Sequence, residues 1–503
     1  MIKSFSPFGY EGSLVTVETD LRRGIPAVDI VGLADNCVKE SRERVITAFK
    51  NQNIDFPSER VLISLSPADL KKEGASFDLP IALSVLEQYG HLELKENVLV
   101  MGELELSGKT RTVRAIEAAL QTAEPNGIRY AIIPKDETVI IPKGIKVAFA
   151  ENLLDSYKIL KDLALNNDTS KFIENKEESE SQFKVEFTEL GEEFSLDDIE
   201  GLNGLKFAMA VAVAGRHNIM AVGSPGCGKT MVLQRMTQLL PKLSEEEFKS
   251  VSRIYSLTGL SGMSVTKDKV RPFRMPHQTA SIEGICGGGV NCRAGEISLA
   301  HNGVLFLDEA AEFRSSVLQM LRVPLETNQI TLSRAGRTTV YPANFQLAMA
   351  VNSCPCGNLG KKDRICLCSA KSVELYWKKF SAPLLDRVGI KFDCNAEDNT
   401  SYYSLEDLRN LVKNSWEIQY ARQGKLNEEL NPKEVMDFIK LDVYAEPHLS
   451  KYAEKKDLSP RAVVNLKKIA RTIQDMTDGA EEVNDISLCT AMSLSNTIPY
   501  GFM

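Results

Sequence analysis

The fold is decided by residues 219–230, which read IMAVGSPGCGKT. A short apolar run, 219–222, is followed at once by a glycine-rich turn and then by a helix-like run, 231–240. A strand, a glycine loop and a helix in this order are typical of an α/β domain that binds a ligand on its loops. We therefore predict an α/β core around this stretch.

The glycine-rich turn matches the phosphate-loop pattern at every position: Gly223, Ser224, Pro225, Gly226, Cys227, Gly228, Lys229 and Thr230. Its glycines allow backbone N–H groups to close around phosphate oxygens. Lys229 would reach the outer phosphates and Thr230 would hold Mg²⁺, so the turn predicts binding of ATP with Mg²⁺. Cys227 is expected to be only a small side chain within the loop. The alternative interpretation is a structural glycine turn.

Three polar side chains follow the next apolar strands along the chain. Asp308 and Glu309 come directly after 304–307, and Asn352 follows 345–351. Strands of such a sheet bring their carboxyl ends to one edge, where ligands bind. We expect Asp308 to bind Mg²⁺, Glu309 to polarise the attacking water and Asn352 to orient that water during ATP hydrolysis. A strand that merely ends in polar, turn-forming residues is the alternative.

The chain has 503 residues, which is too long for one hydrophobic core, so several domains are expected. Residues 1–163 predict a first α/β domain, with strands near 14–18, 61–65, 98–106 and 130–133. Residues 164–193 are polar and rich in glutamate, which predicts a flexible acidic linker. Residues 194–396 would form the ATPase core, and the helical pattern in 397–503 predicts a helical lid.

The composition predicts a folded cytoplasmic protein. It is 43% hydrophobic, 25% charged and 7% aromatic, which suits packed globular domains. No run reaches the roughly 18 to 20 apolar residues that cross a bilayer, so we expect no membrane partner. The net charge of −8 excludes a surface coated in basic residues, so any contact with nucleic acid must be local.

Four of the ten cysteines are clustered: Cys354, Cys356, Cys366 and Cys368 form two Cys-x-Cys pairs separated by nine residues. Four thiolates on a short loop suit tetrahedral Zn²⁺, although this spacing is tighter than the more usual Cys-x-x-Cys. We expect a structural zinc site without an open coordination position. Free buried cysteines or a redox pair are the alternatives.

Further motifs lie along the chain in order: GLAD at 32–35, VKESRER at 38–44, FDLPIA at 77–82, RPFR at 271–274, PH at 276–277, GGG at 287–289, GEISLAH at 295–301, GVLFLDE at 303–309, PLE at 324–326, SRA at 333–335, CPCG at 354–357 and LLDR at 384–387. Together with the phosphate loop, these motifs resemble the YifB/ComM family of magnesium-chelatase-like AAA+ ATPases. The resemblance covers nearly the whole chain.

The resemblance implies a phosphate-loop AAA+ core with a helical lid, assembled as a homo-hexamer. It implies a DNA helicase that moves branched DNA in recombination or natural transformation. Arg387 would be the arginine finger offered to the neighbouring subunit's γ-phosphate, and Arg461 would be the second sensor arginine, which reads the nucleotide from the lid. Either arginine could instead be a surface residue paired with an acid.

By the same resemblance, DNA, single-stranded or branched, is the expected partner. Residues 330–332 and 338–341 read as a hairpin with Arg334 and Arg337 near its tip, which in a ring could face the pore and grip phosphates. An ordinary solvated hairpin is the alternative. The glycine-rich stretch 272–293 resembles the family's insertion in the second helix of the core. A protein-remodelling ATPase or a chelatase-type motor subunit is the alternative function.

The first domain also resembles the proteolytic domain of Lon, whose catalytic dyad is a serine and a lysine. The motif KEGAS at 72–76 puts Ser76 at the nucleophile position, but Glu117 or Ala118 stands where the lysine belongs. Because a serine needs an adjacent base to become a nucleophile, we expect no protease activity. Partner binding, ring assembly and DNA contact are the open roles for this domain.

Overall fold

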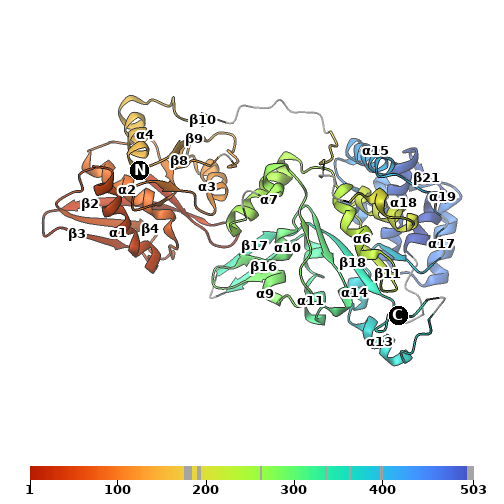
Figure 1. The fold of residues 1–503 in the computed structure, drawn as a ribbon. Coiled ribbons are helices and arrows are strands. Elements are labelled where there is room, and N and C mark those ends of the chain that lie inside the picture. Colours follow the sequence, from red (N-terminus) through yellow and green to blue (C-terminus); the bar gives the residue numbers. More distant parts are fainter. Residues whose placement is uncertain are drawn as a thin grey trace.

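The computed structural model describes residues 1–503 except 137, 175–183, 190–193, 261–262, 335–336, 362–363, 397, 399 and 496–503. Figure 1 shows a first α/β unit at one end, a second α/β unit in the middle and a group of helices at the other end. Much of the acidic linker expected at 164–193 lies outside the described residues. Among the helices that the structure describes, none is both long and apolar enough to cross a membrane.

The first unit is built on an eight-stranded mixed sheet with the order β10-β9-β8-β5-β1-β2-β4-β3. The strands are β1 (Ile2–Ser6), β2 (Ser13–Arg22), β3 (Ala27–Val31), β4 (Arg60–Ser66), β5 (Val98–Val100), β8 (Tyr130–Pro134), β9 (Lys146–Ala150) and β10 (Ile173–Glu174). In β4, Val61, Ile63 and Leu65 are buried in alternation, as expected when a strand turns one face to a core.

Helices cover both faces of this sheet. One face packs against α1 (Asn36–Asn51), α2 (Asp78–Tyr89) and α4 (Leu153–Asn166), and the other against α3 (Ile116–Ala123). The single strand expected at 98–106 is divided, because Gly102 donates its N–H to the Ser76 carbonyl rather than to the sheet. Beyond this point β6 (Glu103–Leu104) pairs with β7 (Thr110–Arg111) as a small hairpin.

The second unit contains a parallel five-stranded sheet with the order β12-β15-β18-β11-β19. These strands are β11 (Ile219–Gly223), β12 (Phe273–Arg274), β15 (Val304–Leu307), β18 (Gln346–Asn352) and β19 (Ile390–Asp393). Strands β11 and β15 are buried along their whole length. A parallel sheet that is covered on both faces requires such continuous apolar runs. For this reason β11 and β15 could be predicted from the sequence.

Helices surround this sheet, and two small hairpins extend from it. The helices are α5 (Asn203–Gly215), α6 (Lys229–Gln234), α7 (Glu245–Thr258), α8 (Ser264–Lys267), α9 (Ile282–Cys286), α10 (Glu296–Leu299), α11 (Ser315–Met320), α12 (Pro324–Thr327), α13 (Ala370–Lys378) and α14 (Ala382–Leu385). The hairpins are β13 (Gly287–Gly288) with β14 (Arg293–Ala294), and β16 (Gln329–Arg334) with β17 (Arg337–Pro342).

The C-terminal part is helical and packs against α5 and the edge strand β19 (Figure 1). Its elements are α15 (Leu405–Gln423), α16 (Pro432–Phe438), α17 (Ala445–Lys456), α18 (Pro460–Thr477) and α19 (Asp485–Ser495), with a short pair β20 (Lys440–Leu441) and β21 (Glu482–Val483). Helix α15 starts at a capping box of Ser404 and Asp407, and α18 starts at Ser459 followed by Pro460. Such caps satisfy the free N–H groups of the first turn.

The first unit is fastened to the second through α7. The guanidinium of Arg253 donates to the main-chain carbonyls of Tyr10, Glu11 and Ala118. Its side chain is almost fully buried. Arg253 therefore lies in the interface between the two units and is held there by hydrogen bonds. The two α/β units are therefore in direct contact as well as joined by the linker.

Candidate active site

The phosphate loop joins β11 to α6, as the sequence predicts. Gly226 and Gly228 have φ values of +79° and +88°, a region that glycine enters without strain. The Lys229 ammonium lies under the loop and donates to the carbonyls of Gly223 at 2.8 Å and Ser224 at 2.9 Å. The loop thus places a buried cation next to its own main chain.

The acidic pair at the end of β15 faces this loop. Thr230 Oγ1 donates to Asp308 Oδ1 at 2.7 Å, so the two expected Mg²⁺ ligands are in direct contact. Glu309 lies just beyond, with a left-handed φ of +46°, and its Oε2 accepts from Gln278 Nε2 at 3.2 Å. Strained backbone at a non-glycine residue is concentrated at functional sites.

The end of β18 completes this edge. Asn352 Oδ1 is 3.4 Å from Lys229 Nζ, which places the expected water-orienting amide beside the phosphate-binding lysine. The parallel register explains the meeting, because Gly223 pairs with Asn352 between β11 and β18. Lys229, Thr230, Asp308, Glu309 and Asn352 therefore share the carboxyl edge of the sheet.

Two further polar residues at this edge, Asn395 and Gln278, were not predicted from the sequence. Asn395, just after β19, accepts from both the N–H and the hydroxyl of Ser224, at 3.1 and 2.9 Å. Its amide nitrogen donates to the Ser353 hydroxyl at 3.0 Å. This asparagine links the phosphate loop to the ends of β18 and β19. Neither Asn395 nor Gln278 belongs to a motif from which this position could be predicted.

Arg387 lies at the opposite edge of the same sheet. Its carbonyl accepts from Asn218 Nδ2 at 2.8 Å, and Asn218 immediately precedes β11. The phosphate loop begins at the other end of that strand, and its five residues at ~3.3 Å per residue span roughly 16 Å. Arg387 therefore cannot serve the phosphate loop of its own chain.

Arg461 lies beside Arg387 rather than over the phosphate loop. Glu326 binds both arginines: its Oε2 accepts from Arg387 Nη2 at 2.5 Å, and its Oε1 is 3.5 Å from Arg461 Nη1. Asn465, one turn along α18, donates to the Asp386 carbonyl at 3.1 Å. Both predicted arginines thus gather at the amino edge of the sheet.

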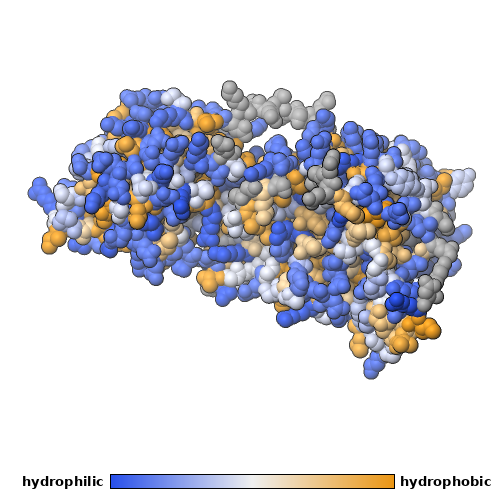
Figure 2. Space-filling view, viewed as in Figure 1, coloured by the Kyte–Doolittle hydropathy of each residue, from blue (hydrophilic) through white to orange (hydrophobic). Residues whose placement is uncertain are grey.

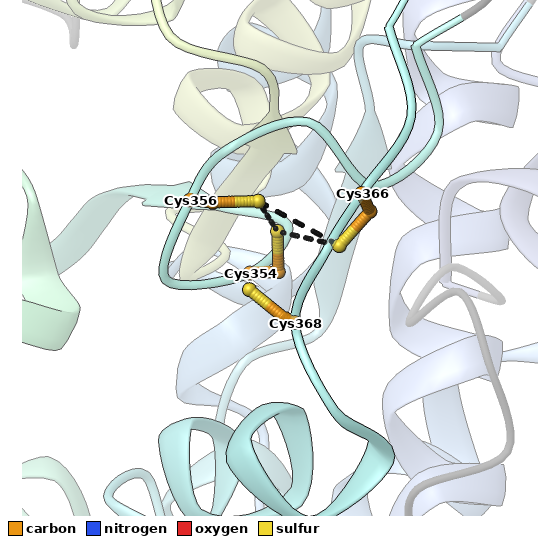
Figure 3. Close-up of side chains that lie close together, drawn as sticks. All are labelled: Cys354, Cys356, Cys366 and Cys368. Atoms are coloured by element: carbon orange, nitrogen blue, oxygen red, sulfur yellow. Dashed lines mark hydrogen bonds between the residues drawn. The ribbon is translucent and has the colours of Figure 1, made fainter.

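The four predicted cysteines come together (Figure 3). Their sulfur atoms all lie within 4.8 Å of one another, and those of Cys354, Cys356 and Cys366 are 3.4 to 3.6 Å apart. The turn after β18 supplies Cys354 and Cys356, and the segment before α13 supplies Cys366 and Cys368. The cluster adjoins the phosphate loop, since a Cβ on Gly357 would lie 2.3 Å from Pro225 Cδ.

Two apolar residues of this cysteine loop are exposed to solvent. Ile365 and Leu367, which alternate with the last two cysteines, are 83% and 89% exposed. Figure 2 shows hydrophobic surface at this corner of the molecule, near α13. Leu359 of the same loop instead packs against the core of the second unit, together with Cys366 and Cys368.

The two arginines of the β16–β17 hairpin differ in their surroundings. Arg334 is half exposed and lies 3.8 Å from Glu283. Arg337 instead contacts the first unit, where its guanidinium donates to the Asp69 carbonyl at 3.2 Å and lies over the ring of Phe8. The tip between the two arginines lies outside the described residues, and Arg334 is the more exposed of the two arginines.

The protease-like pair does not form a dyad. Ser76 is buried in the short 3-10 helix Ala75–Phe77, which directly precedes α2. Glu117 directs one carboxylate oxygen to the Ile140 N–H, and the other forms a very short hydrogen bond with the Ser252 hydroxyl of α7. Burial raises the pKa of Glu117 to about 7. The acid at the lysine position therefore binds the second unit instead of activating a serine.

Three family models match successive parts of the chain. The model described as "Subunit ChlI of Mg-chelatase" matches residues 17–137. The model "Magnesium chelatase, subunit ChlI" matches residues 195–402, and "Magnesium chelatase, subunit ChlI C-terminal" matches residues 403–495. Competence protein ComM of Haemophilus influenzae is 35% identical over 98% of this chain and 96% of its own length. The YifB protein of Escherichia coli is 35% identical over 95% of this chain and 93% of its own length.

A weaker similarity leads to a protease. Lon protease of Mesomycoplasma hyopneumoniae is 23% identical over 167 residues, which cover 31% of this chain and 19% of that protein. This match is much shorter than the matches to ComM and YifB.

Proposed function

The chain belongs to the YifB/ComM family of magnesium-chelatase-like AAA+ proteins, and on this premise we propose that it is an ATP-hydrolysing motor that works as a homo-hexameric ring on DNA. The observation that carries the proposal is the division of the expected catalytic set between two edges of one sheet. Lys229, Asp308 and Glu309 lie at the carboxyl edge, and Arg387 lies at the amino edge. A site divided in this way is completed only by a second copy.

Each residue of the set has a chemical role in ATP hydrolysis. Lys229 and the loop N–H groups bind the phosphates, and Glu309 accepts the proton of the attacking water while Asn352 positions that water. Mg²⁺, held by Thr230 and Asp308, supplies charge neutralisation on the phosphate oxygens when bound. The neighbour's Arg387 neutralises the charge that develops in the transition state.

Mixing two inactive variants tests the shared site. Glu309→Gln removes the acid but keeps the arginine, and Arg387→Ala does the reverse. Each variant alone should lose at least about 100-fold in ATPase rate. If the variants are co-expressed with different tags, about a quarter of the interfaces in randomly mixed rings would be intact, so activity should return to about that fraction. Verified mixed oligomers that remain inactive would refute a site shared between subunits.

DNA as the substrate is supported by the name of one relative, a competence protein, and by the exposed Arg334 on a projecting hairpin. The chain is acidic overall, so a local basic contact is the form that such binding would take. ATPase rates measured with single-stranded DNA, forks and four-way junctions test this. Stimulation by at least one DNA form supports the proposal, and indifference to all of them would favour a protein substrate.

Structural Zn²⁺ is part of the proposal. A zinc–sulfur bond of about 2.3 Å gives sulfur separations of roughly 3.8 Å in a tetrahedron. The sulfur atoms of Cys354, Cys356 and Cys366 are 3.4 to 3.6 Å apart, and all four lie within 4.8 Å of one another. Cys354, Cys356, Cys366 and Cys368 would hold the ion. Because Cys354 follows Asn352 by two residues, the ion would stiffen the strand end that orients the water.

The first unit is proposed to be a Lon-like domain without protease activity that contributes to ring assembly. Its α3 packs against α7 of the ATPase core, and the Glu117–Ser252 hydrogen bond occupies the acid that replaces the lysine. A fluorogenic peptide or casein digest should therefore show no cleavage beyond that of a Ser76→Ala control.

A further inference from the structure

One thiol lies within the nucleotide site itself. Cys227 stands in the phosphate loop, and its sulfur is 3.6 Å from the Lys229 ammonium nitrogen. The sulfur is directed at the end of β11, because a Cβ built on Gly223 would lie 3.0 Å from it. The thiol is therefore folded under the loop, next to the cation that binds phosphate.

A second thiol reaches the same point from the neighbouring strand. Cys394 follows β19, and its N–H donates to the Val222 carbonyl at 2.7 Å, which continues the parallel pairing with β11. The same Cβ on Gly223 would lie 2.9 Å from Cys394 Cβ. Only a glycine at 223 leaves room for the two cysteines, whose side chains both lie against the same point at the end of β11.

The surroundings favour an ionised Cys227. The neighbouring Cys394 thiol and the positive charge of Lys229 lower the pKa of Cys227 to about 6, although partial burial opposes this. The same contact, together with burial, raises the pKa of Cys394. A thiolate beside a protonated thiol is the arrangement in which the first sulfur attacks an oxidant and the second resolves the product.

We propose that Cys227 and Cys394 form a thiol oxidation site inside the nucleotide pocket, where a hydroperoxide produces an intramolecular disulfide that lowers nucleotide affinity. The Cys227 thiolate attacks the hydroperoxide, an S–O bond forms, the O–O bond breaks and an alcohol, or water from hydrogen peroxide, leaves after protonation. The Cys394 sulfur then attacks the Cys227 sulfenic acid, an S–S bond forms and water leaves. In total, two thiols are oxidised and one peroxide is reduced.

The disulfide would disturb the loop for a geometric reason. To form the disulfide, the two sulfur atoms must approach to ~2.05 Å, which draws Cys227 toward the end of β19. Cys227 lies between Gly226 and Gly228, whose N–H groups must point at the phosphates together with that of Lys229. Drawing the centre of this cradle toward Cys394 separates donors that act on one ligand. We expect nucleotide affinity to fall at least about tenfold.

The test uses the full-length protein, hydrogen peroxide and a fluorescent ATP analogue with Mg²⁺. The oxidised protein should yield a Cys227–Cys394 cross-linked peptide by mass spectrometry and bind the analogue at least tenfold more weakly, with recovery after dithiothreitol. Cys394→Ser should give no cross-link and instead a Cys227 adduct with dimedone, which traps sulfenic acids. Cys489→Ser, which removes an exposed thiol on α19, should respond as the parent does.

The outcomes separate this proposal from the proposed ATPase, on which its effect on nucleotide affinity rests. If the reduced protein failed to bind the analogue, the proposed ATPase function would be contradicted. The Cys227–Cys394 cross-link could still be detected by mass spectrometry. Absence of both the cross-link and the dimedone adduct would overturn the oxidation site, as would a cross-linked protein with unchanged affinity. Saturating ADP with Mg²⁺ should slow the oxidation, and an equal rate would place the reactive sulfur outside the pocket.

Discussion

Glu117→Gln should remove a pH dependence from the contact between the two α/β units. The side chain is 3% exposed, and burial raises its pKa to about 7, against the ordinary 4.5 of a glutamate in the unfolded chain. An acid whose folded pKa is raised contributes its full stability below pH 4.5, and this contribution is lost as pH rises through about 7. The wild-type protein must therefore become less stable from pH 5 to pH 8.

The magnitude follows from the same two values. At 1.36 kcal/mol per pH unit, the difference between about 7 and 4.5 corresponds to roughly 3 kcal/mol at pH 8. Between pH 5.5 and 8 the wild type should lose roughly 2 kcal/mol of this. For units of 150 to 250 residues, 1 kcal/mol corresponds to about 2–4 °C in Tm. A glutamine resembles the protonated acid, so the Tm of Glu117→Gln should not fall with this titration. The Tm difference between Glu117→Gln and wild type should therefore be about 4–8 °C larger at pH 8 than at pH 5.5.

Thermal unfolding followed by circular dichroism from pH 5.5 to 8.5 measures this effect, and amide hydrogen exchange in α3 and α7 locates it. Glu124→Gln, at an exposed position just after α3, is the matched control and should keep the wild-type pH dependence. A Glu117→Gln protein whose Tm follows pH in parallel with wild type would refute the reasoning, because the buried acid would then not be the group that titrates.

Three further experiments probe the nucleotide site, the cysteine cluster and the hairpin. Glu309→Gln should bind ATP with wild-type affinity and hydrolyse it at least about 100-fold more slowly, whereas Lys229→Ala should lose binding itself; equal turnover by Glu309→Gln and wild type would contradict the assignment. Metal analysis should find about one Zn²⁺ per chain and almost none in Cys366→Ser, and equal zinc in both would exclude the cluster. Arg334→Ala should weaken DNA binding and reduce its salt slope by about one, unlike the exposed lid control Lys455→Ala; an unchanged slope would remove the hairpin contact.

Part of the carboxyl edge of the second sheet could be predicted, because Asp308, Glu309 and Asn352 directly follow strong sequence signals. Asp308 and Asn352 each follow an apolar strand, and a parallel sheet brings strand ends together. Gln278 and Asn395 reach the same edge from loops of no recognisable pattern, so only the folded chain shows their contacts.

The position of the two arginines lay further beyond sequence reasoning. Motifs suggested what Arg387 and Arg461 are, but they could not show that both lie at the amino edge of the sheet. That fact depends on the direction of β11 and β19 and on the docking of α18 beside Asp386. Likewise, the role of Arg337 in holding the first unit follows from a contact with Asp69, 268 residues away.

Glu326 gives the two arginines a common dependence. It is 56% exposed and binds Arg387 and Arg461 with its two oxygens, and ion pairs with an exposed partner are worth roughly 0–1 kcal/mol. A triphosphate carries more charge than one carboxylate and is held in a pocket with less water, so it competes well for the same guanidinium groups. In a ring, the γ-phosphate of a neighbour could therefore draw both arginines away from Glu326. Because the two arginines share one carboxylate, withdrawal of one would leave both oxygens of Glu326 to the other, so Glu326 would hold whichever arginine the neighbour's nucleotide leaves behind.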